Sequence, residues 1–204
     1  MPPWCVAGTN ERPGHPLVKQ EVKKLMNQFQ GLNTTIFGGT ILALIAGFFR
    51  DATPLNQRPL ALWLFVAFFI LLRLKIFWDD QQYFAKAVTK NGYFKIGLVI
   101  GVISWLVWAS AAWTMINLRD AYFYVGVAIG ISMLWIIADA LRKGAYREQY
   151  FWIGTNTLFI LLLWMLYRRN TPIGDVLTWS LLGGAIVIVI IDFFISKSVP
   201  ELEH

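Results

Sequence analysis

Apolar residues in this chain come in long blocks that are separated by short charged or polar stretches. A helix needs about 17–25 mostly apolar residues to cross a hydrocarbon core that is roughly 30 Å thick. The blocks have that length, and most of the turns between them are short enough to make consecutive helices antiparallel. The pattern predicts an all-α protein of six transmembrane helices in three antiparallel hairpins, at residues 32–49, 60–78, 94–116, 121–140, 150–167 and 176–195.

The first block is the weakest of the six. Asn33, Thr34, Thr35 and the Gly38-Gly39 pair dilute its first turns. We still count it as a span, because the distribution of charge among the loops is consistent only with an even number of spans.

A different pattern precedes the first block. Between residues 16 and 31, apolar residues recur at helical spacing while charged and amide side chains fill the other face. The apolar set is Leu17, Val18, Val22, Leu25, Met26 and Phe29. This pattern predicts an amphipathic cytoplasmic helix that lies in the plane of the lipid headgroups. Packing against a cytoplasmic loop or a partner is the alternative.

The two ends of the chain are expected to be tails. Residues 1–15 hold three prolines, two glycines and no apolar stretch as long as that of a secretory signal, which predicts disorder. The expected organisation is a disordered tail at 1–15, the amphipathic helix at 16–31, a transmembrane domain at 32–197 and a C-terminal tail at 198–204. The last three residues, Leu202-Glu203-His204, read as the remnant of an affinity tag.

Composition supports a membrane protein over a soluble one. The chain is 57% hydrophobic and only 15% charged, whereas soluble domains carry about 25% charged residues. The net charge is +6, but the basic residues sit at the ends of apolar blocks. Anionic lipid headgroups account for that placement, and we expect no nucleic-acid partner because no compact basic domain is present.

Lys and Arg are distributed unevenly between the two sides of the predicted bundle, and cytoplasmic loops carry the excess in membrane proteins. One side holds five: Arg50, Arg58, Arg119, Arg168 and Arg169. The other side holds thirteen: Arg12, Lys19, Lys23, Lys24, Arg73, Lys75, Lys86, Lys90, Lys95, Arg142, Lys143, Arg147 and Lys197. Both termini are therefore predicted to be cytoplasmic, with the cell (inner) membrane as the expected location.

Residues that carry chemistry are scarce. A single cysteine, Cys5, excludes an internal disulfide, and two histidines outside the spans argue against haem or a metal cluster. Motifs of metalloproteases, serine hydrolases and phosphate-binding loops are absent from the sequence. We expect no cofactor, no metal and no enzymatic activity.

Small residues recur at every fourth position in several blocks. Such stripes let helix backbones approach closely and gain dispersion contacts that lipid does not match. The stripes are Gly39, Ala43 and Gly47, then Gly97 and Gly101, then Gly126 and Gly130. They predict helix-helix contacts within one subunit or between subunits.

Ionisable residues near the cytoplasmic ends of the blocks form the first candidate site. Asp139, Asp192 and Arg73 fall at similar depth, which predicts a charged mouth for an ion or polar solute. The alternative is that these groups form ion pairs that hold helix ends together. Asp79 and Asp80 are expected to cap a helix that begins at Gln81, or else to bind a cation.

Polar and indole side chains near the middle of the third and fifth blocks form the second candidate site. Trp105 and Trp108 lie far from the interface where tryptophan usually occurs, and buried indole nitrogens need acceptors. Ser104, Ser110 or Asn156 could supply them. A polar-aromatic cavity with Ser104, Trp105, Trp108 and Asn156 is the hypothesis, and simple packing is the alternative.

These observations favour a channel or small transporter that passes an ion or small polar solute. A homo-oligomer is expected, because six short spans leave little room for a solute cavity inside one subunit. One alternative is a non-transporting scaffold, sensor or membrane-perturbing effector that meets a cytoplasmic partner through residues 79–92. The other is an intramembrane protein or enzyme that binds membrane lipid or a small molecule.

Overall fold

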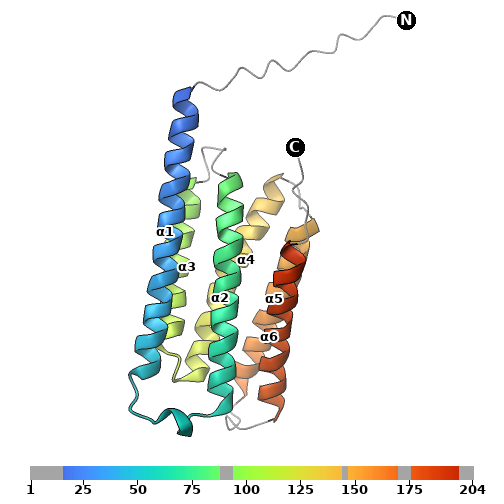
Figure 1. Cartoon of the computed structure of the whole chain (residues 1–204). Coiled ribbons are helices and arrows are strands. Elements are labelled where there is room, and N and C mark those ends of the chain that lie inside the picture. Colours follow the sequence, from blue (N-terminus) through green and yellow to red (C-terminus); the bar gives the residue numbers. More distant parts are fainter. Residues whose placement is uncertain (1–15, 88–93, 144–146, 170–175, 198–204) are drawn as a thin grey trace, which may run out of the picture.

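The computed structural model describes residues 16–87, 94–143, 147–169 and 176–197, and all of its regular elements are helical. Five of the six α-helices are long and apolar enough to cross a membrane, and α3 holds a shorter apolar segment over Val99–Trp113. The helices are α1 (Pro16–Phe49), α2 (Leu60–Ala87), α3 (Phe94–Trp113), α4 (Leu118–Lys143), α5 (Arg147–Arg168) and α6 (Val176–Lys197), with a short 3₁₀ turn, η1 (Leu55–Gln57). The fold is all-α across the described residues (Figure 1).

Helix α3 ends earlier than the predicted span at 94–116. The chain turns after Trp113, where the Asn117 backbone N–H donates to the Thr114 carbonyl at 2.8 Å. Asn117 then precedes α4, and its side-chain amide donates to the Asp120 carboxylate at 2.6 Å. A polar residue before the first turn and an acidic residue within it are typical of a helix start. The polar residues at the start of α4 therefore decide where the turn lies, although apolar residues continue through Ile116.

Two other helices are longer than the sequence predicted. Helix α1 has no boundary at Leu32, so residues 16–31 continue directly into the first apolar block, and their placement in the headgroup plane stays a prediction. Helix α2 continues through Asp79 and Asp80 to Ala87. The expected cap before Gln81 is therefore wrong, because Asp79 lies inside a continuous helix. Residues 88–93 lie outside the described part of the chain.

The six helices form a closed ring. In order around the ring they are α1, α2, α6, α5, α4 and α3, with α3 packed against α1 to close it. Consecutive helices run in opposite directions, and both described ends of the chain lie at the same end of the bundle (Figure 1). The packing of α1 against α3 and of α2 against α6 joins elements that are not neighbours in the sequence. The bundle does not divide into three separate hairpins.

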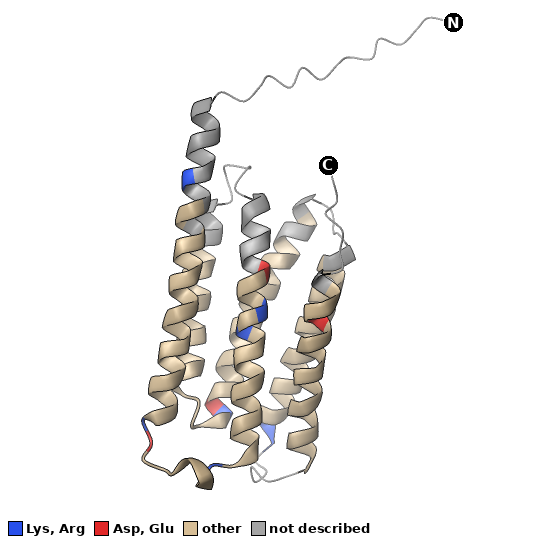
Figure 2. Ribbon diagram, viewed as in Figure 1, with Lys and Arg blue, Asp and Glu red and all other residues tan. Residues whose placement is uncertain are grey.

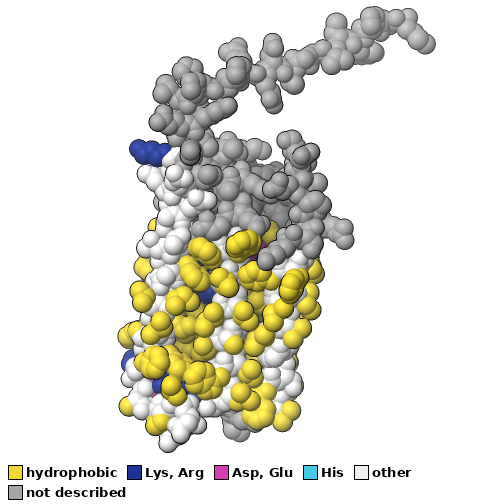
Figure 3. All heavy atoms as spheres, viewed as in Figure 1, with side chains coloured by type: hydrophobic (Ala, Val, Ile, Leu, Met, Phe, Trp, Pro, Cys, Tyr) yellow, Lys and Arg dark blue, Asp and Glu magenta, His cyan; other side chains and the backbone are white. Residues whose placement is uncertain are grey.

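The outer surface of the ring is more hydrophobic than an ordinary protein surface. Large apolar side chains point outward from several helices, among them Leu42 at 68% exposure and Phe194 at 69%. Hydrophobic side chains cover much of the face seen in Figure 3. Figure 2 shows that charged residues occur at the turns and at a similar height on α2 and α6. Exposed apolar area on this scale marks a surface that meets lipid or protein rather than water.

Aromatic side chains of α2 fill the half of the ring near the 50–59 turn. The Phe65 ring lies 4.7 Å from the Tyr122 ring of α4, and the Phe68 ring lies 5.6 Å from the Phe159 ring of α5. The Phe69 ring lies 5.4 Å from the Trp108 ring of α3. All of these distances fall in the range of favourable aromatic pairs. Through this layer α2 packs against α3, α4 and α5.

The small-residue stripe of α1 is a helix-helix contact, as predicted. A Cβ added at Gly47 would meet the Ala112 carbonyl oxygen at 2.5 Å and the Trp113 Cα at 2.8 Å, so α1 and α3 approach each other through this glycine. At Gly39, an added Cβ would meet the Trp105 indole nitrogen at 3.4 Å.

The later stripes differ from the first. A Cβ at Gly101 or Gly130 would meet nothing within 4 Å, and one at Gly126 would just touch Leu163 of α5 at 4.0 Å. Gly101 and Gly130 therefore make no close helix contact within this chain, and contacts between subunits at these positions stay a prediction.

The turn between α1 and α2 is organised by a buried arginine. The Arg58 guanidinium donates to the Phe48 carbonyl at 2.6 Å, to the Asp51 carbonyl at 3.1 Å and to the Thr53 carbonyl at 3.3 Å. The Thr53 hydroxyl donates to the Asp51 carboxylate at 2.6 Å, and this hydrogen bond lowers the pKa of Asp51. The turn is a fixed element that sets the distance between α1 and α2.

Enlarging Gly47 should destabilise the bundle. Gly47→Leu places a side chain where the α3 backbone lies, and overpacking of this kind costs about 1–3 kcal/mol. We expect a lower melting temperature for the purified protein in detergent, measured by loss of the monodisperse peak on heating. Gly38→Leu is the matched control, since an added Cβ there meets nothing within 4 Å. Equal melting temperatures for the two variants would contradict the close approach at Gly47.

Candidate binding cavity

A cavity of about 150 Å³ lies inside the ring, and every one of the six helices contributes to its wall. It occupies the half of the bundle that lies farther from the 50–59 turn than the aromatic layer does. Along α2, the lining residue Leu72 lies roughly 10 Å from Phe65 of that layer, at about 1.5 Å per residue. The wall mixes aliphatic and indole surface with polar groups. The polar and charged lining residues are Asn33, Arg73, Lys75, Asp79, Ser104, Ser132, Gln149, Thr155, Asn156 and Asp192.

Both candidate sites predicted from the sequence fall largely at this one place. Ser104, Trp105, Trp108 and Asn156 all line the cavity, as do Arg73 and Asp192. Asp139 lies on α4, but its side chain is outside the described residues. The charged group and the indole group, which the sequence presented as separate features, therefore share one cavity.

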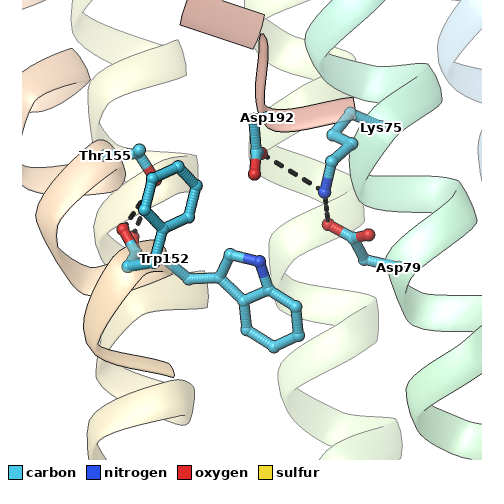
Figure 4. Close-up of polar contacts among 6 residues, drawn as sticks. Lys75, Asp79, Trp152, Thr155 and Asp192 are labelled. Atoms are coloured by element: carbon cyan, nitrogen blue, oxygen red, sulfur yellow. Dashed lines mark hydrogen bonds and ion pairs between the residues drawn. The ribbon is translucent and has the colours of Figure 1, made fainter. Parts of the chain in front are cut away.

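The strongest polar feature of the wall is an ammonium held between two carboxylates. Lys75 is 2% exposed, and its Nζ pairs with the Asp79 carboxylate one turn further along α2 and with the Asp192 carboxylate of α6 at 3.2 Å. Figure 4 shows the amine pointing between the two carboxylates, with the Trp152 indole nearby. The ring centre of Trp152 lies 6.0 Å from the Lys75 nitrogen. This ion-pair group joins α2 to α6.

Helical spacing explains why these residues meet. Residues four apart lie on one face of a helix, so Lys75 and Asp79 are neighbours on α2 and both face the ring interior. Asp192 enters from α6, which packs against α2. The ion pair between Asp192 and Lys75 joins two helices, as the ion-pair interpretation of Asp192 expects. Sequence reasoning placed Lys75 near the cytoplasmic end of the 60–78 block but gave it no partner. The signal it missed was the four-residue spacing to Asp79.

Arg73 brings a second cation to the opposite flank of the wall. It is 3% exposed, and it lies about 200° around α2 from Lys75 at about 100° per residue. Its guanidinium carbon is 5.1 Å from the Trp108 ring centre on α3 and 6.0 Å from the Phe37 ring centre on α1. Guanidinium groups pack favourably on aromatic faces. Because Arg73 and Lys75 line the cavity, neither contributes to the charge of the loops.

Two indole nitrogens of the wall are buried donors without acceptors. Trp108 is 1% exposed, and neither its Nε1 nor that of Trp105 has a hydrogen-bond partner among the described residues. The serine acceptors expected from the sequence are not used in this way, since the Ser110 hydroxyl donates to the Leu106 carbonyl of its own helix at 2.8 Å. A buried N–H left unpaired costs free energy, so an acceptor inside the cavity would be favoured.

The cavity lies within one chain, which removes one reason to expect a homo-oligomer. A homo-oligomer was expected because six short spans leave little room for a solute cavity inside one subunit. The ring of six helices provides that room. Assembly into a homo-oligomer stays a prediction, but solute binding does not require it.

Comparisons with known proteins give no match. No protein-family model, no curated protein and no solved structure matches this chain. No residue roles carry over from a family, and the chemistry of the cavity follows from its own side chains.

Removing the ammonium should cost more stability than removing one carboxylate. Lys75→Met leaves Asp79 and Asp192 facing each other without their shared cation, and breaking a buried pair in this way costs about 3–5 kcal/mol. Asp192→Asn keeps the pair between Lys75 and Asp79 and should cost less. Thermal unfolding in detergent measures both, and a double variant tests whether the two losses add. A larger loss for Asp192→Asn than for Lys75→Met would contradict the arrangement.

Proposed function

We propose that this protein is an integral membrane carrier that binds a small polar solute in the cavity inside a single chain. In this proposal all six helices cross the bilayer, α3 included, and both ends of the chain face the cytoplasm at the cell (inner) membrane. The observation that carries the proposal is the charged, six-helix cavity in one half of the bundle, with the aromatic layer filling the other half.

The two halves of the ring favour a carrier over an open pore. A pore needs a continuous polar path, with binding weak enough for the ion to leave. Here the side chains of Phe65, Phe68 and Phe69 are fully buried between the cavity and the turn that links α1 to α2. A solute held in the cavity would reach the other side only when this layer moves, which is alternating access.

The distribution of polar residues supports a solute site over simple packing. Charged residues inside a membrane protein are costly and usually mark a path or a binding site. Four charged side chains and several amides and hydroxyls converge on one cavity, while the lipid-facing positions are apolar. Ion pairing alone would need neither an open volume nor the additional polar groups around it.

Filling the cavity should slow transport strongly. Gly101 lines the cavity, and a Cβ there meets nothing within 4 Å, so Gly101→Leu projects a side chain into free space without disturbing a helix crossing. We expect transport to fall by about tenfold or more, the effect of a cost of about 1–3 kcal/mol on solute binding. The measurement is saturable uptake of labelled glycine, L-alanine, acetate, glycerol and potassium into proteoliposomes.

Gly38→Leu is the control for this experiment, because Gly38 is exposed on α1, does not line the cavity and also has nothing within 4 Å of an added Cβ. The control variant should transport like the wild type. If no probe enters above protein-free liposomes, or if Gly101→Leu and Gly38→Leu transport equally, the carrier proposal fails and a scaffold or sensor becomes the better interpretation.

A further inference from the structure

Helix α3 brings two unused hydrogen-bond donors to the cavity wall. Trp105 and Trp108 both line the cavity, and the buried Nε1 of each has no hydrogen-bond partner among the described residues. Residues three apart lie on the same side of a helix, so both indoles belong to one part of the wall. An indole N–H donates a hydrogen bond and has no lone pair with which to accept one. This part of the wall therefore favours a ligand that presents acceptor oxygens.

Hydroxyl oxygens on two other helices of the wall have the opposite need. The Ser132 hydroxyl of α4 donates to the Ala128 carbonyl at 3.1 Å. The Thr155 hydroxyl of α5 donates to the Phe151 and Trp152 carbonyls at 3.1 and 3.2 Å (Figure 4). Because each hydroxyl hydrogen is used within its own helix, the oxygen has only lone pairs to offer to the cavity that it lines. These positions therefore favour a ligand that presents hydrogen-bond donors.

We propose that the solute is a small neutral polyol of the glycerol class. This inference rests on the carrier proposal above and specifies its solute. Each hydroxyl of a polyol both accepts and donates hydrogen bonds. One such molecule can therefore accept from the indoles of Trp105 and Trp108 and donate to the oxygens of Ser132 and Thr155. Its C–H groups would lie against the aliphatic and indole surface that makes up the rest of the wall.

Volume limits the size of the ligand. A cavity of roughly 150 Å³ accommodates a molecule of about six non-hydrogen atoms, as benzene shows in an apolar cavity of that size. Glycerol has this size, whereas sugars and longer polyols exceed the 150 Å³ present here. L-Lactate and L-alanine have as many non-hydrogen atoms as glycerol, so size alone does not select among the three.

The cost of leaving water favours the neutral molecule among these three. An ionised group loses far more free energy on entering a protein interior than a hydroxyl that finds new hydrogen-bond partners. The buried ammonium of Lys75 is already paired with Asp79 and Asp192. A carboxylate can accept from the indoles, but it has no hydrogen to donate to the oxygens on α4 and α5. L-Alanine can donate and accept, but both of its charges would have to leave water.

The test follows the indole N–H resonances of the isotope-labelled full chain in lipid nanodiscs by NMR during a titration with glycerol. A new hydrogen bond moves an indole proton downfield, and the concentration dependence of the shift gives the affinity. Glycerol should move the resonances of Trp105 and Trp108, which are assigned with Trp105→Phe and Trp108→Phe. The Trp179 resonance is the internal control, because its nitrogen is likewise buried without a partner among the described residues but the residue does not line the cavity. It should not move.

A series of ligands tests the class of solute in the wild-type protein, so this comparison does not depend on the folding of any variant. Propylene glycol has one hydroxyl fewer than glycerol, and L-lactate and L-alanine carry charge. Each should bind at least about fivefold more weakly than glycerol, the loss expected for about one hydrogen bond.

A pair of variants on α5 locates the donor end of the contact. Thr155→Val removes the acceptor oxygen and keeps the branched shape, so glycerol should bind about fivefold more weakly. Thr157→Val is the matched control. The Thr157 hydroxyl likewise donates within its own helix, to the Ile153 carbonyl at 2.7 Å, but the residue does not line the cavity. The control variant should bind glycerol like the wild type.

The outcomes separate this inference from the carrier proposal. L-Lactate or L-alanine binding as tightly as glycerol would overturn the neutral polyol, and so would unchanged Trp105 and Trp108 resonances on addition of glycerol. Equal effects of Thr155→Val and Thr157→Val would overturn the assigned contact with α5. In each case uptake of another probe that falls in Gly101→Leu would leave the carrier intact, whereas no uptake of any probe would end both.

Discussion

The ammonium of Lys75, held between the carboxylates of Asp79 and Asp192, is the interaction on which the interior of this bundle depends. Acyl chains outside the ring offer no counter-charge and no hydrogen bonds, so a cation at this depth must find its partners inside the protein. Two carboxylates from α2 and α6 provide them. The polar residues around these charges also face the interior, and large apolar side chains occupy the outer surface.

Helix α2 links the two halves of the molecule. Toward the 50–59 turn its phenylalanines contact aromatic rings of α3, α4 and α5. Toward the other end, Arg73, Lys75 and Asp79 line the cavity. A movement of α2 would therefore change the aromatic layer and the solute site together. The ion pair between Lys75 and Asp192 makes α6 the helix most directly coupled to such a movement.

The sequence predicted the helices and most of the site residues, because span length and apolar content are local properties. The ring order was not predictable in this way, since packing of α1 on α3 and of α2 on α6 depends on contacts far apart in the chain. The role of Lys75 was missed for a related reason: α2 was expected to end before Asp79, which hid the four-residue spacing between them. The Gly47 contact was anticipated from its stripe, whereas Gly101 shows that the same pattern can border an open cavity.

The central claim is that polar, accessible space lies inside a ring whose outer face meets lipid. Two adjacent residues of α3, which lie at nearly the same depth in the bundle, test this claim. Ser104 lines the cavity, and Ile103 is 47% exposed on the outer face. In a background where the single cysteine, Cys5, is replaced by serine, Ser104→Cys and Ile103→Cys are treated in proteoliposomes with a small water-soluble methanethiosulfonate. Such reagents need a thiolate, which lipid surroundings suppress. We predict modification at position 104 and none at position 103; equal reactivity, or the reverse order, would contradict the account.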